Sequence, residues 1–215
     1  LHHHELAHEW WGNLVTCRDW KDMWIHEGIG TYMQALYIEE RHGAKAYRVE
    51  MATKRRSIAN RRPIAPREPT DSVAIYFGTD GAGGVSDSDI YFKGSWVCHT
   101  LRYLVGDEAF AKVLRRWAYP DPNLEQRTDG SQVRLVDSEE IIAIAERVSA
   151  RELDWFFDAY LRVAALPRLT TKHTGGTLHL RWVVPGDRPF PMPVPVRVGE
   201  TIHRVEMPAG QGSLE

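Results

Sequence analysis

Hydrophobic residues with a helical spacing run through the first four-fifths of the chain. The clearest case follows Ser88, where apolar residues recur at i, i+7, i+11 and i+14 and so share one face of a helix. These residues are Ile90, Val97, Leu101 and Leu104. Ser88 and Asp89 are expected to cap this helix, and Gly106 is expected to end it. The pattern predicts a mainly α region.

Further helices are predicted over about residues 4–13, 22–42, 44–60 and 107–118, with two more beginning near residues 137 and 153. Gly43 is a favoured residue just past a helix C-terminus. Asp137 lies three residues before Glu140, and Ser149 lies three residues before Glu152. Both pairs match the capping-box pattern and are expected to start helices.

Two segments between the predicted helices have non-helical sequence patterns. Residues 14–17 form a short extended piece, and residues 61–87 contain three prolines and a glycine-rich run at 78–84, which predicts a long surface loop. The glycine run lacks the Gly-Lys-Ser/Thr ending of a phosphate-binding loop. We expect it to give the loop mobility instead.

Alternation replaces the helical period after Pro167. Leu178, Leu180 and Trp182 fall on one side of a predicted strand, with polar residues between them. Five prolines between residues 185 and 198 indicate edge-like strands or polyproline segments. We place a boundary near residue 166. Because about 50 residues of strand cannot close a sandwich of roughly 100 residues, this β region is either a small appendage or a truncated domain.

Composition and charge narrow the class of protein. The chain has 215 residues, 43% of them hydrophobic and 26% charged, which is typical of a folded globular protein and excludes extensive disorder. Its 27 Lys and Arg against 29 Asp and Glu give a net charge of −2, so no global field attracts nucleic acid. No apolar run is long enough for a membrane span, and two cysteines cannot form a disulfide-dense scaffold.

The segment His4-Glu5-Leu6-Ala7-His8 fits the pattern H-E-x-x-H. Residues four apart on a helix differ by about 40° and lie about 5–6 Å apart, so two imidazoles can converge on one metal ion. The carboxylate of Glu5 can then contact water at the metal rather than the metal itself. Glu27, 19 residues after His8, can reach back from a second helix as the third ligand. Two histidines and one glutamate with an open fourth position make a catalytic zinc site.

These four residues and their neighbours resemble the gluzincin metallopeptidases, and within them the aminopeptidase N type family. The flanking residues 9–16 and 24–28, EWWGNLVT and WIHEG, are similar to the family's signatures. The resemblance implies a thermolysin-like helical catalytic domain over residues 1–166, with one Zn²⁺ between two helices, followed by the start of a β-strand domain over residues 167–215. It implies His4, His8 and Glu27 as metal ligands and Glu5 as general base.

A second motif of the family is similar to Tyr91-Phe92-Lys93-Gly94. By this resemblance Tyr91 donates its phenolic hydrogen to the oxyanion that forms on the substrate carbonyl. Residues 156–161 look like the helix that ends the family's catalytic domain. The implied function is removal of N-terminal residues from peptides by zinc-activated water. The alternatives are a non-catalytic zinc-binding or scaffold fragment and an epoxide hydrolase on the same scaffold.

Other chemically suggestive residues have simpler interpretations. His2 and His3 lack the spacing of His4 and are expected not to bind the metal, and His26 is expected to be packed or hydrogen-bonded. The basic cluster, made of Lys54, Arg55, Arg56, Arg61 and Arg62, is expected to be a solvated helix face. Cys17 and Cys98 are expected to be buried small apolar groups.

The two ends indicate a fragment. Leu1 starts the chain without an initiator Met or signal-peptide features, and residues 212–215 look like a cloning linker. We therefore expect N-terminal and C-terminal domains of the parent protein beyond both ends. The resembled family recognises the substrate's amino group with a strand upstream of the zinc helix. The sequence thus leaves exopeptidase and endopeptidase activity, and the cellular location, open.

Overall fold

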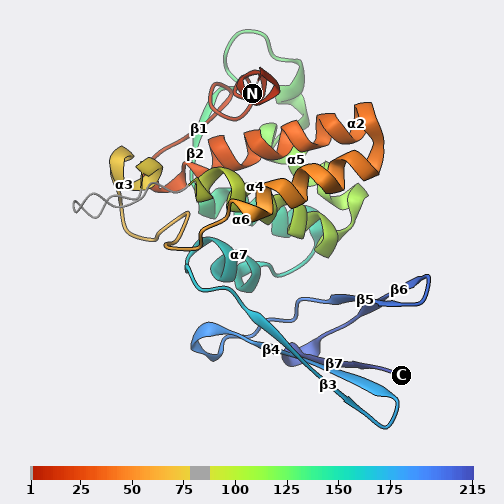
Figure 1. Cartoon of the computed structure of the whole chain (residues 1–215). Coiled ribbons are helices and arrows are strands. Elements are labelled where there is room, and N and C mark those ends of the chain that lie inside the picture. The colour runs from red at the N-terminus through yellow and green to blue at the C-terminus, as the bar shows by residue number, and fades with distance from the viewer. Residues whose placement is uncertain (1, 78–87) are drawn as a thin grey trace.

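A computed structural model of the chain describes residues 2–77 and 88–215 (Figure 1). Its helices are α1 (His2–Ala7), α2 (Trp24–Arg56), α3 (Ser72–Phe77), α4 (Asp89–Val105), α5 (Asp107–Ala118), α6 (Ser138–Ser149) and α7 (Asp154–Leu161). Its strands are β1 (Val15–Cys17), β2 (Arg134–Val136), β3 (Arg168–Thr174), β4 (Thr177–Val183), β5 (Val194–Val198), β6 (Thr201–Val205) and β7 (Gln211–Leu214). The prediction of a mainly α protein with a C-terminal β region is confirmed.

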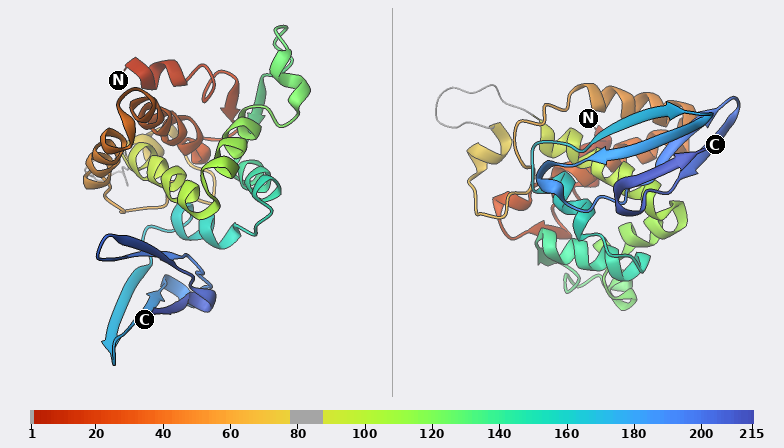
Figure 2. Two further views of the ribbon diagram at one scale, coloured as in Figure 1. Left: turned by 90° about the vertical axis from the view of Figure 1, so that its right-hand side faces the viewer. Right: turned by 90° about the horizontal axis from the view of Figure 1, so that it is seen from below.

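Helices α2 and α4 pack against each other at the centre of the helical part (Figures 1 and 2). They approach most closely at two glycines. A Cβ atom added to Gly28 would lie 2.8 Å from the Cα atom of Gly94, and one added to Gly94 would lie 2.7 Å from the Cα atom of Gly28. Since a larger residue at either position would force the backbones apart, the glycines set the distance between the starts of the two helices.

Helix α2 bends at Gly43, where φ is 79° and ψ is 173°. This positive φ favours glycine because the residue has no Cβ atom to clash with the backbone. The predicted helix end at Gly43 is confirmed as a break in the dihedral angles. The second arm of α2 ends at Arg56, a few residues before the predicted end at residue 60.

The main core lies between α2, α4, α5, α6 and α7. The four residues predicted to share one face of α4, Ile90, Val97, Leu101 and Leu104, are all buried, as expected. Large aromatic side chains that are fully buried join them, namely Trp24, Tyr32, Phe110, Trp117, Phe156 and Phe157. Burial of each such side chain contributes about 1.5–3 kcal/mol. This core fixes the start of α2, where the candidate metal ligand Glu27 is located.

Strands β1 and β2 pair in parallel, with Val15 opposite Arg134. Close by, Ser138 at the start of α6 donates from its backbone N and its Oγ to Asp22 Oδ1, at 3.1 and 2.5 Å. Trp24 Nε1 in turn donates to Ser138 Oγ at 2.8 Å. These contacts attach the segment between α1 and α2 to a distant part of the chain.

The β region packs beneath α7 as two small antiparallel sheets, one ordered β3-β4-β7 and the other formed by β5 and β6 (Figure 1). A separate small core is formed by Leu180, Val194, Val205 and Met207. Phe190 and Met192 of the same region belong to the main core. Pro195 lies in β5, which has a single neighbouring strand and is therefore an edge, as predicted. The boundary near residue 166 remains a prediction.

Two predicted elements were wrong. The first helix was expected over residues 4–13, but α1 ends at Ala7 and the chain then turns, with Gly12 at a φ of 152°. Residues 61–87 were expected to be a loop throughout, yet α3 forms within them because Ile75 packs into the main core. The glycine run at 78–84 lies outside the described residues.

The helix caps also differ in part from the prediction. Asp137 caps α6 as expected, accepting a hydrogen bond from Glu140 N at 2.9 Å. Ser149 is instead the last residue of α6, and α7 starts without a side-chain cap in the described structure. Ser88 likewise makes no capping bond there. Among the described residues, no helix combines the length and the apolar character that a membrane span requires.

Candidate metal centre

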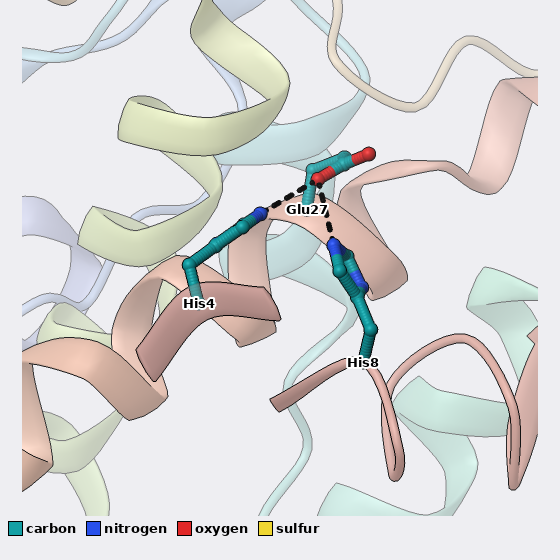
Figure 3. A group of neighbouring side chains, drawn as sticks. All are labelled: His4, His8 and Glu27. Atoms are coloured by element: carbon teal, nitrogen blue, oxygen red, sulfur yellow. Dashed lines mark hydrogen bonds and ion pairs between the residues drawn. The ribbon is translucent and has the colours of Figure 1, made fainter. Parts of the chain in front are cut away.

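Three predicted ligands converge where α1 meets the start of α2. The Nε2 atoms of His4 and His8 lie 3.2 and 3.6 Å from Oε2 of Glu27 (Figure 3). All three ligand atoms lie within 4.8 Å of one another. Within residues 2–77 and 88–215, this is the group of histidine, cysteine and acidic side chains with the geometry to hold a metal ion. The structure thus brings together the three side chains that the spacing argument selected.

The separations of the two histidine nitrogens from the glutamate oxygen fit a tetrahedral zinc site. Zinc binds histidine nitrogen and carboxylate oxygen at about 2.0–2.1 Å, so two of its ligands are separated by about 3.3 Å in a tetrahedron. The separations of 3.2 and 3.6 Å between the histidine nitrogens and the glutamate oxygen bracket this value. Two imidazoles and one carboxylate are also the donor set of catalytic rather than structural zinc sites.

Hydrogen bonds at the other ring nitrogens orient both histidines. Nδ1 of His8 lies 2.9 Å from the backbone oxygen of Trp11, to which it can only donate. Nδ1 of His4 lies 3.3 Å from Oγ1 of Thr31. A protonated Nδ1 leaves Nε2 of His8 with a free lone pair that faces Glu27. This arrangement is typical of metal-binding histidines.

Glu27 is buried in the first turn of α2, with an exposed fraction of 7%. Burial would raise the pKa of its carboxyl group, but hydrogen bonds from His4 and Tyr76 and the nearby imidazoles outweigh burial and lower the pKa. The carboxylate is therefore ionised at neutral pH, as a metal ligand must be. Its Oε1 accepts a hydrogen bond from the Tyr76 hydroxyl at 2.8 Å.

Glu5 and Tyr91 line the same open cleft as the three ligands. The cleft has a volume of about 400 Å³ and also contains Thr31, Gln34, Lys54 and Phe92. Glu5 is exposed, whereas Tyr91 is half-buried with its ring centroid 5.8 Å from that of His4. Burial and the carboxylates of Glu27 and Glu5 raise the pKa of Tyr91, so its phenol keeps its proton and can act as a donor.

The sequence of the helical part matches a known family model. The model represents the peptidase family M1 domain, and it matches residues 1–160. The chain belongs to peptidase family M1. The resemblance to the aminopeptidase N type family, based on the motifs around His4, Glu27 and Tyr91, is thereby confirmed.

Curated M1 relatives support the same assignment. Aminopeptidase N of Lactococcus lactis subsp. lactis is 31% identical over 183 residues, which cover 82% of this chain and 20% of the relative. Aminopeptidase N of Streptomyces lividans is 29% identical, and the match covers 76% of this chain and 18% of the relative. The chain thus spans about a fifth of the length of these relatives.

Two solved structures share the fold. The M1 zinc metallopeptidase of Deinococcus radiodurans has a TM-score of 0.58 and 25% identity, covering 77% of this chain and 33% of that one. Aminopeptidase A of Legionella pneumophila, solved with aspartic acid, has a TM-score of 0.67 and 18% identity, covering 98% of this chain and 23% of that one.

The structure gives His3 an aromatic neighbour and His26 a hydrogen bond, the latter as predicted. His3 stacks on Tyr37, with ring centroids 3.8 Å apart, and His26 Nε2 accepts a hydrogen bond from Cys17 N at 2.9 Å. Cys98 is buried, as predicted. Cys17 is only half-buried and contributes to a second cavity, so the prediction for this residue holds in part.

Sequence reasoning missed two residues at the M1 centre. Lys54 was assigned to a solvated basic face, but it is 6% exposed, lines the cleft and pairs with Glu50 at 2.7 Å. Tyr76 fell in a segment predicted as loop, although it contacts Glu27 directly. No spacing rule links either residue to the motifs, because the burial of Lys54 in the cleft and the contact of Tyr76 with Glu27 depend on how distant segments pack.

Proposed function

We propose that this chain carries the catalytic centre of a zinc-dependent aminopeptidase. In this proposal His4, His8 and Glu27 hold one zinc ion, Glu5 acts as general base and Tyr91 stabilises the oxyanion. The observation that carries the proposal is the convergence of three ligand atoms, within 4.8 Å, in a cleft that also contains Glu5 and Tyr91. Membership of family M1, whose matched relatives are named aminopeptidases, supports the choice of reaction.

The zinc ion would supply polarisation of the scissile carbonyl and an acidified water. Glu5 accepts a proton from the attacking water as the water oxygen bonds to the carbonyl carbon. It then passes this proton to the leaving amine as the carbon–nitrogen bond breaks, so no other acid is needed. The Tyr91 hydroxyl donates a hydrogen bond to the carbonyl oxygen as negative charge develops there.

The proposal extends to the architecture. Residues 1–166 form a thermolysin-like catalytic domain, and residues 167–215 are the start of a β-strand domain. The matched relatives are much longer than this chain, which is consistent with further domains on either side. Peptides are the substrates, and recognition of their free amino group depends on residues outside this chain.

The substitution Glu5→Gln tests the assigned chemistry. It keeps the size of the side chain but removes the group that carries the proton, so we expect zinc to remain bound and turnover of an aminoacyl anilide to fall by about 10²–10⁴-fold. The assay uses this chain and a longer version with the flanking segments. An unchanged rate would rule out Glu5 as the base.

Blocked substrates separate aminopeptidase from endopeptidase activity. In the longer version, a peptide with a free amino group should be cleaved and its acetylated form should not. Equal cleavage of both would contradict the aminopeptidase assignment. Hydrolysis of epoxides without hydrolysis of peptides would favour the alternative reaction on the same scaffold.

A further inference from the structure

Tyr76 makes a direct contact with the candidate metal ligand Glu27. Its hydroxyl donates to Oε1 of Glu27 at 2.8 Å, while Oε2 of the same carboxylate faces His4 and His8 at 3.2 and 3.6 Å. The two carboxylate oxygens therefore have different partners. Oε1 is held by the Tyr76 phenol. Oε2 faces the two histidines at the candidate metal position (Figure 3).

A carboxylate that ligates a metal needs an outer partner. The terminal torsion of a glutamate is broad and nearly two-fold, so without such a partner the two oxygens of Glu27 can exchange places or approach the metal together. Hydrogen bonds to ligating groups fix their orientation, and their removal typically reduces metal affinity 10–100-fold. Tyr76 makes such a bond to Glu27.

The structure holds Tyr76 in place from several sides. Its ring packs edge-on against Trp20 and lies near Tyr91, with centroid separations of 6.3 and 6.4 Å. The preceding residue, Ile75, is 2% exposed in the main core, and its carbonyl accepts a hydrogen bond from Arg62 at 3.0 Å. Helix α3 is thus anchored well enough to fix the hydroxyl position.

Tyr76 and Tyr91 reach the centre from different cavities. Tyr91 lines the cleft that contains Glu5, where the substrate would bind. Tyr76 lines a neighbouring cavity of about 540 Å³ with Cys17, Trp20 and His26. A residue that contacts Glu27 and lines a different cavity from Glu5 suits a role that acts through Glu27.

We infer that Tyr76 is a positioning residue for the metal centre: its hydroxyl holds Oε1 of Glu27 so that Oε2 is the oxygen offered to zinc. This inference rests on the proposed function, because it takes His4, His8 and Glu27 as the zinc ligands. It assigns a role in metal retention to α3, a segment that the H-E-x-x-H pattern does not include.

The test is the zinc affinity of Tyr76→Phe, measured by competition with a chromophoric chelator. The substitution removes one oxygen and leaves the ring packing in place, so we expect zinc to bind 10–100-fold more weakly. Tyr119→Phe is the matched control, since Tyr119 is at the end of α5 and outside both cavities. Affinity of Tyr76→Phe within twofold of the parent would overturn the inference.

A second pair of variants distinguishes a positioning role of Tyr76 from a general effect on the fold. In the Glu27→Ala variant, only the two histidines remain as zinc ligands. Adding Tyr76→Phe to this variant should weaken zinc binding by less than twofold. A further tenfold loss there would show that Tyr76 acts through the fold and would overturn the inference. If the parent chain itself binds no zinc, the proposed function fails; if it binds zinc and Tyr76→Phe has no effect, only the role of Tyr76 fails.

Discussion

At the scale of single residues, the convergence of the candidate metal ligands could be predicted, and their supporting partners could not. His4 and His8 are four positions apart, so local backbone geometry alone brings their rings together, with centroids 4.6 Å apart. Their hydrogen-bond partners Trp11 and Thr31 became identifiable only from the folded structure. Tyr76 is even more remote, because 49 residues separate it from Glu27.

Asp22 is a buried acid, and the direction in which it makes stability change with pH can be predicted. Burial raises its pKa above the ordinary 3.8, although hydrogen bonds from Ser138 oppose this shift. Over a pH range above 3.8, the folded protein therefore holds a proton that the unfolded chain has lost. The free energy of unfolding should fall as the pH rises through that range.

The substitution Asp22→Asn removes this titration while keeping an oxygen that can accept from Ser138. We expect the stability of the variant relative to the parent to increase from pH 4 to pH 7, as measured by urea unfolding with a chelator present. Asp154→Asn, at an exposed position, is a control with the same change of charge. Parallel stability curves for Asp22→Asn and the parent would contradict this account.

At the scale of elements, the helix pattern predicted most of the fold, and its failures have physical causes. The apolar face of α4 and the cap at Asp137 are local features, and both were predicted correctly. The second predicted cap failed because Ser149 continues α6 as its last residue, and Leu153 N before α7 donates to Glu146 Oε1 at 2.7 Å. Helix α3 was missed because it is short and depends on burial of Ile75 against distant helices.

The contact between α2 and α4 gives a prediction at this scale. Gly94→Ala would place a Cβ atom 2.7 Å from the Gly28 backbone, so the two helices must separate. We expect a loss of about 1–3 kcal/mol in the free energy of unfolding, as is typical of overpacking. A separation of the helices would also move Tyr91, one turn earlier on α4, relative to Glu27.

Gly30→Ala, in the facing helix α2, is the matched control for the unfolding measurement. A Cβ atom there would meet its nearest neighbour at 3.5 Å, an ordinary contact, so the higher helix propensity of alanine should leave stability equal or improved by up to about 1 kcal/mol. Equal stability of Gly94→Ala and Gly30→Ala would argue against the close contact as a constraint on the fold.

At the scale of the whole molecule, residues from four separate segments assemble the centre. The segments around residues 5 and 27 contain the candidate ligands. The segment around residue 76 contacts Glu27, and the segment around residue 91 lines the cleft. The sequence predicted the first two of these from spacing and the last from resemblance to a family. Under the proposed function, metal binding is linked to folding, because zinc that binds only the folded chain stabilises it.

The zinc content of the purified chain is the most direct measurement of the central claim. After saturation with zinc and dialysis, elemental analysis should give one zinc ion per chain for the parent and for Glu5→Gln, which leaves all three ligands in place. Glu27→Ala should retain far less zinc under the same conditions. No bound zinc in the parent, or equal retention by Glu27→Ala, would contradict a centre formed by His4, His8 and Glu27.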